Sequence, residues 1–316
     1  MGGLEVLSGK PVLVTGAAGF LGANLVRRLL DLGAHVFGVV RPGTPAPRLE
    51  GVTQRITLHE LDLRNGAGVL ELFRRVTPAY VFHLAMKSGH PRTPEERLVW
   101  LHESLGVTAN ILEAAVQVPV QRVVHVGSFL EYGSRFLPLH EGMVLRPTTP
   151  RGLAKAAATL VVRLYAKSAG VPAVIVRPFS VYGPWEPPRR FIPTLLRAAV
   201  TGEEVTLTAS TVRHDFVYVG DVVDACLLAA FRKLQPGEIV NAGTGVQWSN
   251  EEVLTVVERV TGRRLRVRRG GYPGSPADSP WWVASTAKSK RVLGWTPAFD
   301  LPSGLWQTWA WMNTHG

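Results

Sequence analysis

The sequence predicts an α/β fold in which a doubly wound parallel sheet is followed by a smaller C-terminal lobe. A short apolar run at 12–14 leads through a glycine-rich turn into a helical pattern, and further strand patterns then alternate with helical ones. From about residue 185 the proline density rises and the pattern becomes irregular. We therefore expect a main domain at 1–184 and a smaller lobe at 185–316, part of which returns to the main sheet.

The composition is that of a globular chain. Its 316 residues are 46% hydrophobic, which is enough for a sizeable core. The first residues lack a basic region followed by a long apolar run, and no apolar stretch approaches the roughly 20 residues of a membrane helix, so we expect a cytoplasmic protein. The single cysteine, Cys226, lies in an apolar run that favours a small buried side chain over a nucleophile. No metal site is predicted.

The turn after the first strand predicts a dinucleotide phosphate site of the Rossmann type. Gly16, Gly19 and Gly22 follow the apolar run, and Phe20 and Leu21 begin the helical pattern. A turn this tight needs residues without Cβ, which also let the backbone approach a pyrophosphate closely. The amides at the start of the helix present partial positive charge to the phosphates.

The other elements of the main domain continue the alternation. They are strands at 34–40, 56–61, 80–85, 122–126 and 173–176, and helices at 95–116 and 152–168. Ligands of such sheets bind at the carboxyl ends of the strands. The second strand is followed by Arg41, where an acidic residue usually meets the ribose of NAD; an arginine pairs with a 2′-phosphate instead, so NADP is favoured over NAD.

Further residues at strand ends complete this prediction. Asp62 and Leu63 follow the third strand, where the carboxylate can accept from the adenine amino group. The fourth strand ends at Leu84 and Ala85, over which a cofactor can lie. Ser128 follows the fifth strand, which places it at the same edge of the sheet.

The C-terminal lobe is predicted to hold the substrate. Its expected elements are helices at 191–200 and 250–261 and strands at 205–207 and 217–219. Six of the nine tryptophans lie between Trp281 and Trp311, which packing of this segment explains better than a base-stacking surface. The net charge is +11, and the dense arginine run at 263–269 fits a strand with Leu265 and Val267 inward. Its outward arginines form either a solvated face or a phosphate-facing edge.

Several motifs spread over nearly the whole chain match one pattern. They are Thr-Gly-Ala-Ala-Gly-Phe-Leu-Gly at 15–22, Phe-His-Leu-Ala at 82–85, Arg-Pro-Phe at 177–179, Tyr-Gly-Pro at 182–184, Asp-Phe-Val-Tyr-Val-Gly-Asp at 215–221 and Leu-Gly-Trp-Thr-Pro at 293–297. The chain thereby resembles the extended short-chain dehydrogenase/reductases, a family that includes nucleotide-sugar epimerases, 4,6-dehydratases and 4-ketoreductases. The resemblance implies hydride exchange between a nicotinamide cofactor and a carbon of a nucleotide-activated sugar.

The resemblance extends the two predicted sites. The cofactor site then comprises Gly16, Gly19, Phe20, Leu21, Gly22, Arg41, Asp62, Leu63, Leu84, Ala85, Lys87, Lys155 and Pro178. The substrate site comprises Ser128, Ser180, Arg213 and His214. The helices near 97–117 and 152–168 resemble those that join two subunits in this family, so a homodimer is expected.

The catalytic positions depart from the family pattern at one residue. The family has a Ser/Thr, a Tyr and a Lys, and the segment Pro-Arg-Gly-Leu-Ala-Lys at 150–155 places Arg151 where the tyrosine belongs. Ser128 and Lys155 remain. Arginine stays protonated at working pH, so Arg151 can stabilise an alkoxide or bind a phosphate but cannot exchange a proton. Tyr132, Tyr182, His83 and Lys87 are alternative donors among which the sequence does not decide.

Three functions are consistent with these observations. The first is an NAD(P)-dependent 4-ketoreductase or epimerase of nucleotide sugars, with Ser128, Lys155 and Arg151 as catalytic residues. Dehydration is not expected, because Phe129 and Leu130 stand where 4,6-dehydratases have an acidic pair. The second is a cofactor-binding sensor or partner protein without turnover. The third, which is less favoured, is a nucleic-acid binder that uses the edge at 263–269.

Overall fold

The computed structural model describes residues 7–86, 93–208, 212–272 and 281–315. Its centre is a seven-stranded sheet in the order β3-β2-β1-β4-β5-β6-β11, and every neighbouring pair is parallel. The strands are β1 (Pro11–Thr15), β2 (His35–Val40), β3 (Thr57–Glu60), β4 (Tyr80–His83), β5 (Arg122–Val126), β6 (Ala173–Pro178) and β11 (Ile239–Ala242). The predicted α/β fold with a doubly wound parallel sheet is confirmed.

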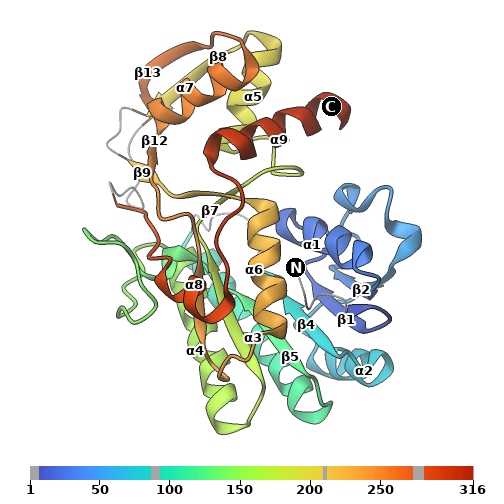
Figure 1. Ribbon diagram of the computed structural model, residues 1–316. Coiled ribbons are helices and arrows are strands. Elements are labelled where there is room, and N and C mark those ends of the chain that lie inside the picture. The colour runs from blue at the N-terminus through green and yellow to red at the C-terminus, as the bar shows by residue number, and fades with distance from the viewer. Residues whose placement is uncertain (1–6, 87–92, 209–211, 273–280, 316) are drawn as a thin grey trace.

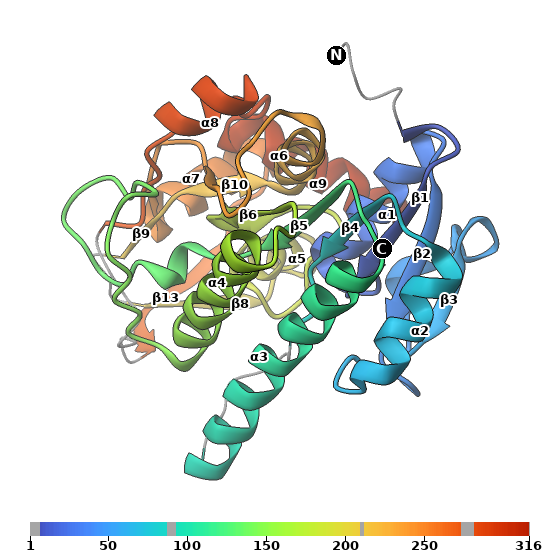
Figure 2. The ribbon, with the colours of Figure 1, turned by 90° about the horizontal axis from the view of Figure 1, so that it is seen from below.

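Helices cover both faces of this sheet. One face carries α1 (Phe20–Asp31) and α6 (Val219–Phe231), and the other carries α2 (Gly66–Val76), α3 (Pro94–Gln117) and α4 (Pro150–Ser168) (Figures 1 and 2). Side chains alternate along β1, so that Val12 and Val14 join the core under α1 while Leu13 joins the core under α3. Burial on both faces explains the continuous apolar runs of these strands.

A third core lies in the lobe above the carboxyl ends of the strands (Figure 1). Its main elements are α5 (Phe191–Thr201), β8 (Glu204–Thr208), α7 (Asn250–Thr261), β13 (Arg266–Tyr272) and α9 (Leu301–His315). The shorter elements are β7 (Ser180–Tyr182), β9 (Arg213–His214), β10 (Phe216–Tyr218), β12 (Trp248–Ser249) and α8 (Ala287–Leu293), with 3₁₀ turns at Pro47–Leu49, Thr53–Arg55 and Phe129–Glu131. Between lobe elements, β11 and α8 return to the main domain.

The arginine-rich segment adopts the predicted alternation. Leu265 and Val267 pack against the lobe core, and the arginines beside them are exposed. Ion pairs join Arg264 to Glu258 at 3.0 Å and Arg269 to Glu251 at 2.8 Å. This pairing favours the solvated face over a phosphate-binding edge.

Two local features of α6 bear on the sequence expectations. The strand expected at 217–219 ends at Tyr218, and Val219 begins α6. Cys226 is fully buried in that helix, as expected. Within the described ranges, no helix combines the length and apolar character needed to cross a membrane.

Candidate functional site

The glycine loop after β1 is shaped by close backbone contacts. Gly16 has φ +71°, and a Cβ there would lie 2.9 Å from the backbone nitrogen of Ala85. A Cβ on Gly22 would overlap the carbonyl oxygen of Gly16, so glycine lets the first turn of α1 rest directly on the loop. The N-cap residue Gly19 offers no side-chain acceptor. The amide groups at the start of α1 are therefore not capped by the side chain of Gly19.

A cavity of about 370 Å³ opens beside this loop. Seven of the predicted cofactor residues line it, namely Gly16, Gly19, Arg41, Asp62, Leu63, Leu84 and Ala85. Three more, Phe20, Leu21 and Gly22, form the first turn of α1. Pro178 ends β6, and Lys87 lies outside the described residues. The remaining lining residues are Ala18, Val39, Val40, Thr44, Pro45, Arg48, Leu61, Arg64, Met86, Glu103, Ser104 and Val107.

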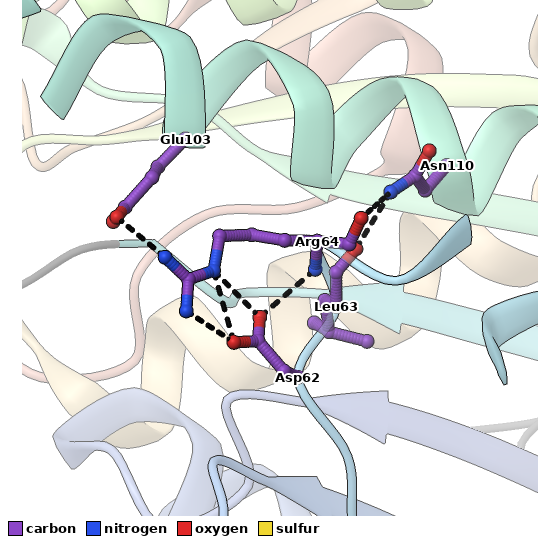
Figure 3. A network of polar contacts seen from close by, with 5 residues as sticks. All are labelled: Asp62, Leu63, Arg64, Glu103 and Asn110. Atoms are coloured by element: carbon purple, nitrogen blue, oxygen red, sulfur yellow. Dashed lines mark hydrogen bonds and ion pairs between the residues drawn. The ribbon is translucent and has the colours of Figure 1, made fainter. Parts of the chain in front are cut away.

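A polar network fixes one wall of the cavity (Figure 3). Arg64 donates from Nε to both oxygens of Asp62, at 3.0 and 2.9 Å, and from a terminal nitrogen to Glu103 of α3 at 3.0 Å. Asn110 of α3 donates to the carbonyl oxygens of Leu63 and Arg64. Hydrogen bonds from Arg64 lower the pKa of Asp62 to about 2, so its carboxylate is ionised at neutral pH.

Arg41 lines the same cavity as Arg64 but differs from it in its side-chain partners. Its positive charge makes a minor contribution to the low pKa of Asp62, but no described residue forms a hydrogen bond or an ion pair with its side chain. Arg41 is exposed at the cavity edge. A guanidinium that is not engaged by a carboxylate is suited to an anionic group of a ligand.

Ser128 is held at the carboxyl end of β5 by a reciprocal cap. Its Oγ accepts from the backbone nitrogen of Leu130 at 3.2 Å, and its own backbone nitrogen donates to Glu131 at 2.7 Å. Glu131 is fully buried and forms an ion pair with the equally buried Arg177 of β6 at 2.7 Å. This pair ties the Ser128 turn to the neighbouring strand.

Lys155 approaches the same strand end from α4. Its Nζ donates to the carbonyl oxygen of Val126 at 2.5 Å, and the residue is 7% exposed. Gly152 allows this approach, because a Cβ there would lie 2.5 Å from the carbonyl oxygen of Leu130. Burial, and then the positive charge of Arg151, lower the pKa of Lys155 to about 8. Ser128 and Lys155 are thus brought to the end of one strand.

Two buried histidines lie near Lys155. The ring of His83 bridges the hydroxyls of Thr15 and Thr108, at 2.8 and 3.2 Å. Burial lowers the pKa of His83 to about 3, with a smaller contribution from the charge of Lys155. The ring of His125 lies at a centroid distance of 5.3 Å from that of His83, and neither of its nitrogens has a hydrogen-bond partner among the described residues.

Arg151 occupies the first turn of α4 and is exposed to solvent. Neighbouring protein atoms still desolvate its guanidinium in part, and this effect, with a smaller contribution from the charge of Arg190, lowers its pKa. Arg190 forms an ion pair with Glu186 at 3.0 Å, and the side chain of Glu186 is only 4% exposed. Burial raises the pKa of Glu186 to about 7, although Arg190 opposes the shift.

Three of the four predicted substrate residues, Ser180, Arg213 and His214, lie on the short strands β7 and β9. The hydroxyl of Ser180 bonds Nδ1 of His214 at 3.1 Å, which joins β7 to β9. Arg213 is engaged by Glu252 of α7 at 3.1 Å. The structure therefore brings Ser180 and His214 together, while the charge of Arg213 is already balanced by a neighbouring carboxylate.

Three of the alternative proton donors are unsuited to that role. Tyr132 is fully buried, donates to Asn241 at 2.7 Å, and has its pKa raised by burial to about 12. Burial also raises the pKa of Tyr182, whose hydroxyl lies 3.4 Å from the carbonyl oxygen of Leu301. His83 is enclosed between two threonines. The fourth, Lys87, is outside the described residues.

A family model for the NAD dependent epimerase/dehydratase family matches residues 12–243. This chain belongs to that family. The match spans the glycine loop, the cavity and the Ser128 and Lys155 positions, so the expectation of an extended short-chain dehydrogenase/reductase is confirmed.

Relatives of this epimerase/dehydratase chain include both reductases and epimerases. The dTDP-4-dehydro-6-deoxy-D-allose reductase of Streptomyces bikiniensis is 30% identical, over 98% of this chain and 98% of the relative. The UDP-glucose 4-epimerase of Thermus thermophilus, solved with NAD, is 30% identical with a TM-score of 0.87, over 96% of this chain and 99% of that one. The UDP-glucuronic acid 4-epimerase of Bacillus cereus, solved with UDP-glucuronic acid and NAD, is 25% identical with a TM-score of 0.86, over the same shares.

Two groups in this family member were missed by sequence reasoning. Glu131 follows Ser128 by three residues, and this Ser-x-x-Glu spacing is a capping-box signal that was available in the sequence. Glu186 gives no comparable signal, because its burial depends on how the segment after β7 packs.

Proposed function

We propose that this chain binds a nicotinamide dinucleotide and acts on a nucleotide-activated sugar, as a 4-ketoreductase or 4-epimerase. The observation that carries the proposal is the placement of Ser128 and Lys155 at the end of β5, in the sheet whose β1 end forms the glycine cradle. The reductase and epimerase relatives, whose names specify dTDP- and UDP-sugars, support the substrate class.

The residues present fit a dinucleotide. Gly16 and Gly22 let the loop pack closely against Ala85 and against the first turn of α1, which begins without a side-chain cap, so its backbone amides are suited to a pyrophosphate. Asp62 lines the same cavity and is held ionised, so it can accept a hydrogen bond from an adenine amino group. The solved relatives contain NAD, whereas Arg41 at the cavity edge favours the 2′-phosphate of NADP. We propose both as ligands, with NADP preferred.

Three side chains of the protein supply the other groups that the reaction needs. When bound, the nicotinamide supplies or accepts the hydride. Ser128 donates a hydrogen bond to the reacting oxygen of the sugar, and Arg151 stabilises negative charge that develops on it. Burial lowers the pKa of Lys155 to about 8, so we assign to Lys155 the proton exchange that the family tyrosine performs.

Dehydration is not part of this proposal. Phe129 stands next to Ser128, and its ring packs on Phe179 and Trp282 at centroid distances of 5.5 and 4.9 Å. Elimination of water would require an acid and a base at positions 129 and 130, which are occupied by Phe129 and Leu130.

The two long helices on one face support a homodimer. Exposed apolar residues gather on α3 and α4, which lie side by side (Figure 2). They are Leu98, Val99, Leu153, Leu160 and Leu164, between 46% and 60% exposed. A second copy of this chain would bury them.

The proposed activity is tested by incubating the purified protein with NAD(P)H and 4-keto nucleotide sugars, and with NAD and UDP- or dTDP-hexoses. Cofactor oxidation or a new C4 epimer, detected by NMR, supports the proposal. Ser128→Ala should reduce either rate. If the protein binds the cofactor but converts no sugar, the sensor without turnover replaces this proposal.

A further inference from the structure

A buried carboxylate lies behind the turn that carries Ser128. Glu131 is fully buried, and both of its oxygens accept hydrogen bonds. Its Oε1 accepts from the backbone nitrogen of Ser128 at 2.7 Å. Its Oε2 accepts from Nε of Arg177 at 2.9 Å, and Arg177 belongs to β6, which pairs with β5. Glu131 therefore joins the backbone of Ser128 to a neighbouring strand of the sheet.

The partner of this carboxylate is a cation that is equally buried. The guanidinium of Arg177 lies between Glu131 and the ring of Tyr132, with its carbon 4.7 Å from the ring centroid. Burial raises the pKa of Glu131, and the charge of Arg177 opposes this shift. The guanidinium thus favours the ionised form of Glu131, in which both oxygens are acceptors.

The residue before Ser128 leaves room for the carboxylate. A Cβ on Gly127 would lie 2.4 Å from Oε1 of Glu131 and 3.1 Å from Cγ of Arg177. The backbone of Gly127 does not adopt the left-handed conformation, so the close approach of Glu131 is what its missing Cβ permits. The sequence of the turn is therefore matched to the position of the carboxylate.

The cap leaves the hydroxyl of Ser128 with a hydrogen to donate. Its Oγ accepts from the backbone nitrogen of Leu130 at 3.2 Å, and no described residue accepts the hydrogen of this hydroxyl. A serine hydroxyl has a single donor hydrogen, which is here free for an oxygen of a ligand. Stabilisation of a developing charge depends steeply on where the donor is held. The contact that fixes the backbone of Ser128 therefore bears on the reaction.

We propose that Glu131 is a positioning residue. Held by Arg177, it fixes the backbone of Ser128 so that the hydroxyl is aimed at the reacting oxygen of the sugar. The fully buried side chain of Glu131 acts on that oxygen only through Ser128. The inference rests on the proposed function and adds a residue that lies behind the reacting groups.

The test is a double-mutant cycle on kcat for the reduction of a 4-keto nucleotide sugar. Glu131→Gln should lower kcat by about 10- to 100-fold and leave the affinity for NAD(P)H within about threefold of the wild type. In the Ser128→Ala background, the same substitution should lower kcat by less than about twofold, because the hydroxyl that it misplaces is already absent. Rates are compared at pH 6, where Lys155, with a pKa of about 8, is protonated.

A second variant displaces the carboxylate and keeps every charge. Gly127→Ala places a Cβ 2.4 Å from Oε1 of Glu131, so the carboxylate has to move. The loss of kcat should again disappear in the Ser128→Ala background. This variant carries the test if Glu131→Gln, which leaves Arg177 buried without an anion, does not fold.

The matched control is a cap of the same kind elsewhere. Glu96 accepts from the backbone nitrogen of Thr93 at 3.3 Å at the exposed start of α3, so Glu96→Gln should leave kcat unchanged. Equal losses from Glu131→Gln with and without the hydroxyl of Ser128 would overturn the inference, and so would failure of both test variants to fold, since the carboxylate would then serve the fold alone. If Ser128→Ala keeps the wild-type rate, or if the wild type reduces no sugar, the proposed function fails as well.

Discussion

Lys155 is the residue on which the proposed chemistry depends most. Its ammonium is buried, bonded to a backbone carbonyl, and has a pKa of about 8 because burial and Arg151 disfavour its charge. Carbonyl reduction needs its protonated form, so we predict that kcat falls as the pH rises above about 8. Lys155→Met should lower kcat by about 10²–10⁴ and remove this pH dependence.

The matched control for Lys155 is Lys167, which is exposed in the last turn of the same helix. Lys167→Met should keep the wild-type profile of kcat against pH. A Lys155→Met variant that retains both the rate and the pH profile would show that another group exchanges the proton.

The buried carboxyl of Glu186 should make the stability of the protein depend on pH. Burial raises its pKa from 4.5 to about 7, so the folded protein binds a proton that the unfolded chain has released. Stability from this group is present below pH 4.5 and is lost as the pH rises through about 7. Glu186→Gln stays neutral, and we predict that it raises the free energy of unfolding at pH 8 by about 1–3 kcal/mol.

Chemical denaturation at pH 5 and pH 8 checks this prediction. The gain should be small at pH 5, because the native carboxyl is then already protonated. Glu50→Gln, at an exposed position, should show no such difference. A Glu186→Gln variant that is less stable than the wild type at pH 8 would mean that the ion pair with Arg190 outweighs the cost of burying the charge.

At the scale of elements, the proposed homodimer through α3 and α4 can be tested by a substitution on its face. Leu160 is 56% exposed on α4 and lies on the proposed dimer face. Leu160→Lys places a charge where a second copy would cover it, so we predict a shift from dimer to monomer in sedimentation experiments. Leu137→Lys changes a similarly exposed residue outside these helices and should leave the dimer intact. A monomeric wild type would contradict the proposed face.

The elements also differ in how far the sequence predicts them. The first six strands of the sheet in chain order and helices α1, α3 and α4 follow from runs and periodicities, and the Gly16 loop follows from its spacing, whereas strand β11 was not predicted. Helix α6 could not be predicted from a periodic pattern, because it is apolar on nearly every side and has no amphipathic period. Its first residue, Val219, was therefore expected to belong to the preceding strand.

At the scale of the whole molecule, the site is assembled from segments that are far apart in the sequence. Residues with a fixed place on a strand end, such as Ser128 and Asp62, can be anticipated. The ion pair of Arg190 with Glu186 is local, because the two residues are four apart in the sequence. The effect of the charge of Arg190 on Arg151 depends instead on how α5 of the lobe sits relative to α4, and no local pattern encodes that arrangement.

The central claim is that a site with arginine in place of the family tyrosine still exchanges hydride with a sugar carbon. In the most direct measurement, the protein is incubated with deuterated NAD(P)H and a 4-keto nucleotide sugar. The mass of the recovered sugar is then determined by mass spectrometry. We predict the transfer of one deuterium to the sugar by the wild type and much slower transfer by Lys155→Met. Binding of both ligands without any deuterium in the sugar would contradict the claim.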